Sequence, residues 1–87
     1  MKVKFSRQFT KQYDKAPIKI RQAFKNRLGI FREDKYNPLL NNHSLTGQLK
    51  YYQSINITGG WRAIFKEVDN GEVIFFVMMG THSQLYS

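Results

Sequence analysis

The C-terminal part of the chain, residues 61–86, constrains the fold most strongly because it reads as two strands joined by a tight turn. The first run covers residues 61–68 and the second covers residues 73–79, with Asp69-Asn70-Gly71 between them. An Asn-Gly pair between β-branched and aromatic runs is the strongest short-range signal of a β-hairpin. The second run is apolar throughout, which is typical of a strand that is central in its sheet and covered on both faces.

Two residues suited to proton chemistry follow directly after this hairpin. Gly80 ends the apolar run, His82 comes two residues later, and Tyr86 follows four residues beyond the histidine. A side chain at the end of a buried strand is held on a rigid support. We therefore expect His82 to be presented from that support, with the rest of the chain built around the hairpin.

The N-terminal part of the chain predicts one strand and a hairpin of two helices. Residues 2–5 alternate between polar and apolar, as in a half-buried strand. Ser6 is a favourable N-cap for a short amphipathic helix over residues 7–15, and Pro17 suits the first turn of a second helix. That second helix should end near Asp34. Its apolar face consists of Ile20, Phe24, Leu28 and Phe31.

The middle of the chain predicts a loop followed by a second strand. Residues 35–47 contain turn-forming Asn-Pro and Asn-Asn pairs and place His43 inside the loop. Residues 49–57 then read as a strand. The order β-α-α-β-β-β predicts a single α+β domain over residues 1–87. Its sheet should have four strands, mainly antiparallel, with the N-terminal helical hairpin packed on one face.

The positive charge of the chain is concentrated in the predicted helices. The formal net charge is +8. Residues 1–36 contain eleven of the fourteen Lys and Arg residues but only three of the six acidic residues, so the rest of the chain is balanced. Such asymmetry favours a polyanionic partner, nucleic acid or an acidic protein, over a merely solvated helix surface.

Composition argues against several other classes of protein. The chain has no cysteine, which rules out disulfides, and two histidines with six acidic residues make a metal centre unexpected. No apolar run approaches the ~18 residues of a membrane span, and the N-terminus lacks the apolar stretch of a signal peptide. We therefore expect a cytoplasmic protein that uses no metal or cofactor.

The residues that can carry chemistry are His43, Arg62, His82 and Tyr86, although each also has a structural explanation. A lone loop histidine such as His43 is usually an ordinary surface residue. Arg62 could pair with an acidic residue across the hairpin, a contact of little energetic weight. Tyr86 could belong to a frayed terminus.

Together with their neighbours these residues form a more specific pattern. The segments concerned are His43-Ser-Leu45 with Gly47, Trp61-Arg62 with Ile64, and Gly80-Thr-His-Ser-Gln-Leu85. They resemble the YafQ-like branch of the RelE/ParE toxin superfamily. That branch has a His-Pro-Leu-x-Gly segment before the second strand, a tryptophan opening the third, and a Gly-Thr-His-Ser-Asp-Leu tail. The resemblance runs from the first strand to the tail, and the tail is its most specific part.

The resemblance implies the toxin of a type II toxin–antitoxin pair, acting as a ribosome-dependent endonuclease on messenger RNA. His43 and His82 match two histidines that the branch uses in cleavage. Arg62 matches the arginine set against the scissile phosphate, and Trp61 matches the tryptophan of the active-site cluster. Tyr86 falls near a catalytic tail tyrosine of other members. The implied partners are the ribosome with its message and an acidic antitoxin, with the free toxin a monomer that enters a higher-order complex with the antitoxin.

Two positions depart from the branch, and the general base is therefore unassigned. Asn56 stands where the branch has a further histidine, and Gly60 stands where it has an aspartate before the tryptophan. We expect Asn56, Lys50 and Trp61 to contact substrate. The lysines expected to dock on ribosomal RNA lie in the predicted helices and are Lys11, Lys15, Lys19 and Lys25.

The implied chemistry suits these residue types. RNA supplies its own nucleophile, the 2′-hydroxyl, so the protein must remove one proton, donate another and stabilise charge on the phosphate. Imidazole exchanges protons near neutral pH, and guanidinium is a planar, permanently charged phosphate ligand. Two alternatives remain: a ParE-like toxin that poisons a topoisomerase by binding, and a non-catalytic RNA-binding module of the same fold.

Overall fold

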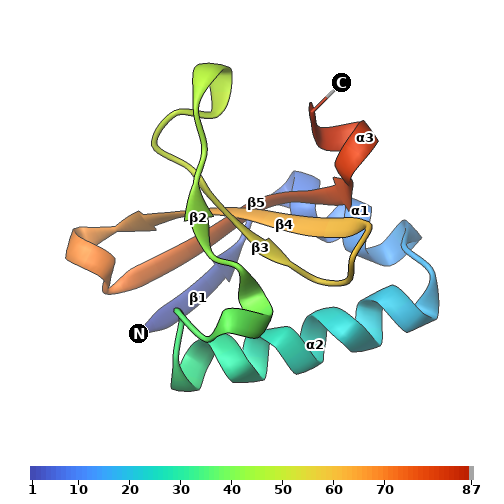
Figure 1. Ribbon diagram of the computed structural model, residues 1–87, viewed down its shortest axis with the longest axis horizontal. Helices are drawn as coiled ribbons and strands as arrows, with labels where there is room; N and C mark the ends of the chain where they lie inside the picture. The colour runs from blue at the N-terminus through green and yellow to red at the C-terminus, as the bar shows by residue number, and fades with distance from the viewer. Residues whose placement is uncertain (87) are drawn as a thin grey trace.

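The computed structural model describes residues 1–86 and places five strands in one sheet, ordered β1-β5-β4-β3-β2 (Figure 1). The strands are β1 (Lys2–Phe5), β2 (His43–Ser44), β3 (Gln53–Asn56), β4 (Trp61–Val68) and β5 (Val73–Thr81). Only β1 and β5 pair in parallel; the other pairs are antiparallel. The α+β class and the mainly antiparallel sheet are confirmed, and the predicted four strands are joined by a fifth, the two-residue β2 at the edge.

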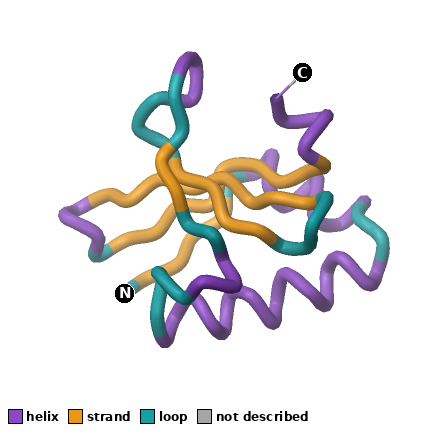
Figure 2. The backbone as a smooth tube through the Cα atoms, in the orientation of Figure 1, coloured by secondary structure: helices purple, strands orange, loops and turns teal. Residues whose placement is uncertain are grey.

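The helices divide between the two faces of the sheet. They are α1 (Arg7–Lys15), α2 (Ile18–Glu33) and α3 (His82–Tyr86), with short 3-10 turns η1 (Pro38–Leu40), η2 (Gly47–Leu49) and η3 (Asp69–Gly71). The first two helices match their predicted spans, and they cover one face of the sheet through the apolar core. Figure 2 shows α3 and the loop that carries η2 projecting from the other side of the sheet. No helix within residues 1–86 is both long and apolar enough to cross a bilayer.

Aromatic rings form the centre of the core between α2 and the sheet. The ring of Phe31 meets that of Phe65 edge to face at 5.2 Å between centroids, and Phe65 lies 5.4 Å from Phe76. Phe9 of α1 and Phe24 of α2 join the same cluster, 5.2 Å apart. All five rings are buried. The predicted packing of both helices on one face is therefore confirmed by contacts between rings, which are favourable in these offset and edge-to-face geometries.

A β-bulge at Val77 changes which residues of β5 face the core. Ile64 pairs with Met78 and Phe65 pairs with Phe76, which leaves Val77 without a partner on β4. The extra residue shifts the alternation by one, so that Phe76 and Met79 both face the helices and are buried. The expectation that β5 is covered on both faces is wrong, because residues between these core positions are only half-buried.

The N-cap of α1 satisfies the backbone of this bulge. The Ser6 hydroxyl donates to the Val77 carbonyl oxygen at 2.7 Å, and the Ser6 backbone N–H donates to the Phe76 carbonyl oxygen at 2.9 Å. The same hydroxyl oxygen accepts from the Phe9 backbone N–H at 2.9 Å, as a helix cap. One serine therefore ends β1, starts α1 and fixes the bulge.

The hairpin turn between β4 and β5 occurs where the Asn-Gly pair predicts it. Asp69, Asn70 and Gly71 have positive φ angles of 53°, 55° and 86°. The connection covers the four residues 69–72, because Val68 pairs with Val73. Gly71 is favoured for two reasons: its φ is left-handed, and a Cβ there would approach the Glu67 Oε1 atom to 3.0 Å.

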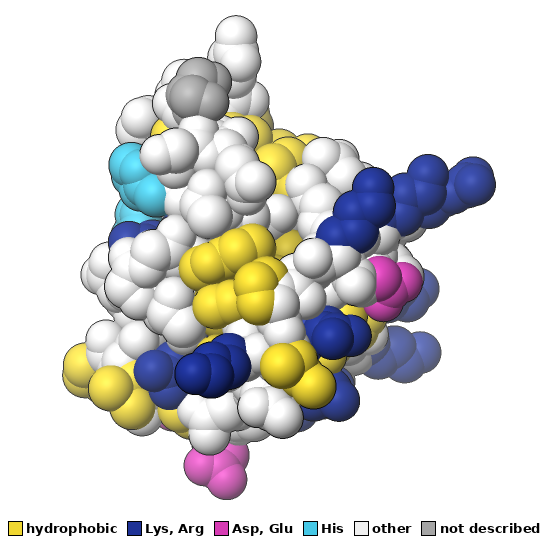
Figure 3. Space-filling view, turned by 90° about the vertical axis from the view of Figure 1, so that its right-hand side faces the viewer, with side chains coloured by type: hydrophobic (Ala, Val, Ile, Leu, Met, Phe, Trp, Pro, Cys, Tyr) yellow, Lys and Arg dark blue, Asp and Glu magenta, His cyan; other side chains and the backbone are white. Residues whose placement is uncertain are grey.

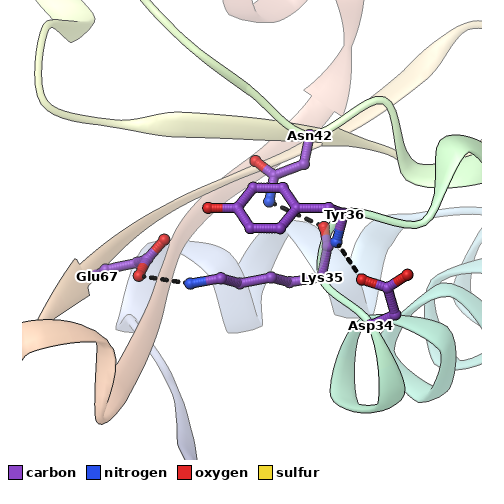
Figure 4. A network of polar contacts seen from close by, with 5 residues as sticks. All are labelled: Asp34, Lys35, Tyr36, Asn42 and Glu67. Atoms are coloured by element: carbon purple, nitrogen blue, oxygen red, sulfur yellow. Dashed lines mark hydrogen bonds and ion pairs between the residues drawn. The ribbon is translucent and has the colours of Figure 1, made fainter.

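Polar contacts tie the end of α2 to the sheet and to the segment before β2 (Figure 4). The Lys35 ammonium lies 3.0 Å from the Glu67 carboxylate, and the Asn42 side-chain amide donates to the Lys35 carbonyl oxygen at 3.0 Å. The hydrogen bond with Glu67 raises the pKa of Lys35 above its ordinary 10.5. The contribution of this ion pair to the stability of the fold is therefore complete below pH 10.5 and is lost as the pH rises through the raised pKa of Lys35. Because both side chains are partly exposed, the pair contributes about 0–1 kcal/mol.

Candidate active site

The sheet face opposite α2 carries the candidate catalytic residues in one pocket. Paired residues point to the same face, and across this end of the sheet Asn56 pairs with Arg62, which pairs with Gly80. Above them lies an open pocket of about 360 Å³. The residues that line the pocket are Asn41, His43, Leu45, Arg62, His82 and Tyr86. The four candidate catalytic residues from the sequence are thus brought together from β2, β4 and α3.

His43 is held by a carbonyl group that determines its tautomer. It lies on β2 and is exposed, so the expectation that it belongs to an irregular loop is corrected to a short edge strand. Its Nδ1 atom lies 2.7 Å from the carbonyl oxygen of Asn41, which adopts the left-handed conformation. A carbonyl oxygen only accepts, so Nδ1 carries a hydrogen and the neutral ring has its lone pair on Nε2.

Arg62 is anchored to the backbone through one nitrogen. Its Nη1 atom donates to the carbonyl oxygens of Thr58, Gly59 and Trp61 at 2.9, 2.9 and 3.1 Å. Within the described residues, the other two guanidinium nitrogens of Arg62, Nε and Nη2, make no hydrogen bond to the protein, so they remain for a ligand. The alternative of a pair with Glu67 is not observed, because that carboxylate contacts Lys35. Arg62 thus closes the β3–β4 connection and still presents donors to the pocket.

A capping box starts α3 and positions His82. The Thr81 hydroxyl oxygen accepts from the Gln84 backbone N–H at 3.2 Å, and the Gln84 side-chain oxygen accepts from the Thr81 backbone N–H at 2.8 Å. A Cβ on Gly80 would approach that side-chain oxygen to 2.9 Å, which favours glycine. The His82 backbone N–H also donates to the Gly60 carbonyl oxygen at 3.0 Å. Sequence reasoning missed α3, although Thr81-x-x-Gln84 is a recognisable signal of a helix start.

Tyr86 fixes the side of α3 that faces the sheet. Its hydroxyl donates to the Ser54 hydroxyl oxygen at 3.3 Å, and its ring centroid lies 4.8 Å from that of His82. Ser54 is fully buried beneath it. Sequence reasoning missed Ser54 and Asn41, because a buried hydroxyl beneath a tyrosine and a backbone carbonyl leave no signal in a single sequence.

The three residues expected to contact substrate lie in three different parts of the structure. Trp61 lies on the helix-covered face and packs against the core, so the pocket does not include it. Lys50 lies in the exposed loop after η2, with its ammonium 5.2 Å from the ring of Tyr51. Asn56 is on the pocket face beside Arg62, and its side-chain oxygen is buried without a hydrogen-bond partner in the part of the chain that the structure describes.

The helix lysines form a surface of their own, away from the pocket. Figure 3 shows histidine side chains at one edge of the molecule and a group of Lys and Arg side chains projecting from the opposite edge. The four lysines expected to dock on RNA are all exposed on α1 and α2, and they are Lys11, Lys15, Lys19 and Lys25. The positive helices and the histidine pocket therefore occupy different sides of the protein.

Comparisons with known proteins identify the fold. No protein-family model and no curated protein matches the sequence. YafQ from E. coli strain BL21(DE3) matches in structure with a TM-score of 0.81 at 20% identity, over 98% of this chain and 97% of that one. A YoeB/ParE toxin from Agrobacterium tumefaciens matches with a TM-score of 0.78 at 15% identity, over 94% and 99%.

A third match includes an antitoxin. The E. coli DinJ-YafQ toxin-antitoxin complex matches with a TM-score of 0.78 at 21% identity, over 98% of this chain and 96% of that one. The chain therefore has the fold of the RelE/YafQ-like toxins. The resemblance seen in the sequence motifs is confirmed at the level of the fold.

Proposed function

We propose that this protein is the toxin of a type II toxin–antitoxin system and a ribosome-dependent endonuclease that cleaves messenger RNA without a metal. The observation that carries this proposal is the convergence of His43, Arg62 and His82 on one pocket. Two proton-transfer groups and a phosphate ligand are what cleavage by the 2′-hydroxyl requires. The toxin fold supports the same assignment.

We assign the two proton transfers to different histidines. The Nε2 lone pair of His43, left free by the bond from Nδ1 to Asn41, removes the proton of the 2′-hydroxyl. The 2′-oxygen attacks phosphorus, the bond from phosphorus to the 5′-oxygen breaks, and a 2′,3′-cyclic phosphate forms. His82 donates a proton to the departing 5′-oxygen, while Arg62 stabilises the charge on the phosphate. His43 is then the general base, although Asn56 and Gly60 replace the histidine and the aspartate of the YafQ-like branch.

Tyr86 acts through His82 in this scheme. Its ring lies against the imidazole and its hydroxyl is engaged by Ser54, which sets the orientation of α3 over the pocket. The asparagine that replaces the branch histidine stays a predicted substrate contact: it pairs with Arg62 on the pocket face, but its side-chain oxygen is buried and does not line the pocket.

A purified translation system tests the function directly. The protein should cut messenger RNA that occupies a ribosome, leave naked message largely intact, and produce 2′,3′-cyclic phosphate ends. A message with a 2′-deoxy nucleotide at the cut site is the matched control and should resist, because it lacks the nucleophile. Growth inhibition with uncut message and an inhibited topoisomerase would contradict the proposal and support the ParE-like alternative.

The four helix lysines should govern docking but not chemistry. Changing Lys11, Lys15, Lys19 and Lys25 together to glutamate should greatly weaken ribosome binding and flatten its salt dependence. Each phosphate contact contributes about 0.7–0.9 log units of affinity per log unit of salt, and a glutamate cannot make that contact. The measurement is ribosome co-sedimentation across a salt series. His82→Ala is the control and should bind like the wild type; equal affinity and slope for the charge-reversed protein would show that the helices are only a solvated surface.

The same helices are the expected docking surface for an acidic antitoxin. Lys25 borders an apolar groove of about 410 Å³ between α1 and α2, whose aromatic lining includes Phe5, Phe9 and Phe24. An antitoxin segment that combines acidic and apolar side chains would match this surface. Antitoxin and ribosome would then compete for one face of the protein.

A further inference from the structure

The open face of the sheet carries a row of alternating cations and aromatic rings beyond the pocket. The Lys66 ammonium lies between two rings, 5.9 Å from the centroid of Tyr52 and 5.7 Å from that of Phe75. Phe75 pairs with Lys66 on one side and with Lys4 of β1 on the other. Lys4, Phe75, Lys66 and Tyr52 therefore form a line that crosses the sheet, which we name the cation–aromatic row.

This row continues the candidate active site along one strand. Lys66 and Arg62 are four residues apart on β4, so both side chains emerge on the same face, about 13 Å apart along the strand. Ile64 lies between them and is fully buried. Other side chains cover Ile64 on this face, so a chain that leaves the pocket at Arg62 passes over them before it reaches Lys66.

The charge of the row is not neutralised within the protein. Among residues 1–86 the one ion pair joins Lys35 to Glu67, and Glu67 is the neighbour of Lys66 that points to the other face. Lys66 and Lys4 therefore present free positive charge beside exposed ring surface. Tyr52 and Phe75 are half-buried, so their positions are fixed while part of each ring remains accessible.

We propose that the cation–aromatic row binds single-stranded RNA, holding the message on one side of the cut. This inference rests on the proposed function. Bases of any identity can stack on Phe75 and Tyr52, and backbone phosphates can contact Lys66 and Lys4. Folded duplex RNA offers no free base faces, so the row selects an unpaired strand. The binding is tolerant of sequence, because stacking and phosphate contacts do not read base edges.

Direct binding in the absence of cleavage tests the proposal. His82→Ala protein is titrated at low salt into a fluorescein-labelled single-stranded RNA oligonucleotide, and anisotropy gives the Kd. Adding Lys66→Met should raise the Kd roughly fivefold or more and lower the salt slope by about 0.7. Phe75→Leu, which keeps an apolar side chain but removes the stacking surface, should raise the Kd about tenfold. Arg32→Met is the matched control: it removes an exposed positive charge on α2, on the other side of the sheet, and should have little effect.

The outcomes separate this inference from the proposed function. Because the His82→Ala protein is used, binding is measured whether or not the wild type cleaves message. Equal Kd values for the Lys66→Met and Arg32→Met proteins, with unchanged melting temperatures, would overturn the row as an RNA surface. No binding by any form would overturn it as well. Displacement of the oligonucleotide by duplex RNA or an acidic peptide at equal concentration would show that charge alone acts, which also contradicts the proposal.

Discussion

Replacing His82 with alanine should abolish message cleavage and growth inhibition while leaving the fold intact. A positioned general acid contributes about 10²–10⁴-fold to the rate, and the alanine cannot protonate the departing 5′-oxygen. The His82 side chain is exposed, so its removal should change the melting temperature by no more than a few degrees. The measurement is the single-turnover rate on ribosome-bound message, followed by the yield of cyclic phosphate ends.

Ser83→Ala provides the matched control on the same helix. Ser83 is exposed and lies next to His82, but it does not line the pocket. The Ser83→Ala protein should cleave at close to the wild-type rate. That result would show that a substitution elsewhere on α3 does not by itself stop the reaction. A folded His82→Ala protein that cuts message as fast as the wild type would refute the assignment of the general acid.

Removing the Arg62 side chain should lower the single-turnover cleavage rate by roughly 100-fold or more, which is typical when one charge-stabilising donor is lost. Ribosome binding should change far less, because the lysines proposed to dock on the ribosome lie on the other side of the protein. The structure gives Arg62 a second role, since its Nη1 atom bonds three backbone carbonyls. Some loss of thermal stability should therefore accompany the loss of rate.

Arg62→Lys separates the two roles of this residue. Lysine keeps the charge but lacks the planar set of donors, so it cannot bond three carbonyls through one nitrogen and contact a phosphate through another. We expect a stability close to that of Arg62→Ala with a cleavage rate between those of the wild type and the alanine variant. A wild-type rate in the alanine variant together with a lower melting temperature would show that Arg62 only closes the β3–β4 connection.

Elements with a repeated pattern or a strong turn signal were predictable from the sequence, and elements without either were not. Both α1 and α2 have apolar residues at helical spacing, and the Asn-Gly pair marks the β4–β5 hairpin. The two-residue β2 has no periodicity to detect. The bulge at Val77 depends on a contact with Ser6, 71 residues away in the chain, and no local pattern encodes such a contact.

The candidate site likewise combines features that the sequence predicts with features that it does not. The motifs around His43, Arg62 and His82 led to residues that share one pocket. The position of Trp61 could have been predicted differently from elementary geometry. Neighbouring residues on a strand point to opposite faces, so Trp61 and Arg62 cannot both face the pocket. The carbonyl of Asn41, which sets the tautomer of His43, depends on backbone conformation and leaves no trace in residue identity.

The short helix that carries His82 has a genetic consequence. None of the buried core residues belongs to α3. A nonsense mutation at codon 82 would therefore remove the proposed acid and Tyr86 while retaining the core, the sheet and the basic helices. On the proposed function, an allele of this kind would encode a folded, harmless protein that still occupies the antitoxin. Cells that escape the toxin by such a mutation would then carry less free antitoxin to restrain a second, intact copy of the toxin gene.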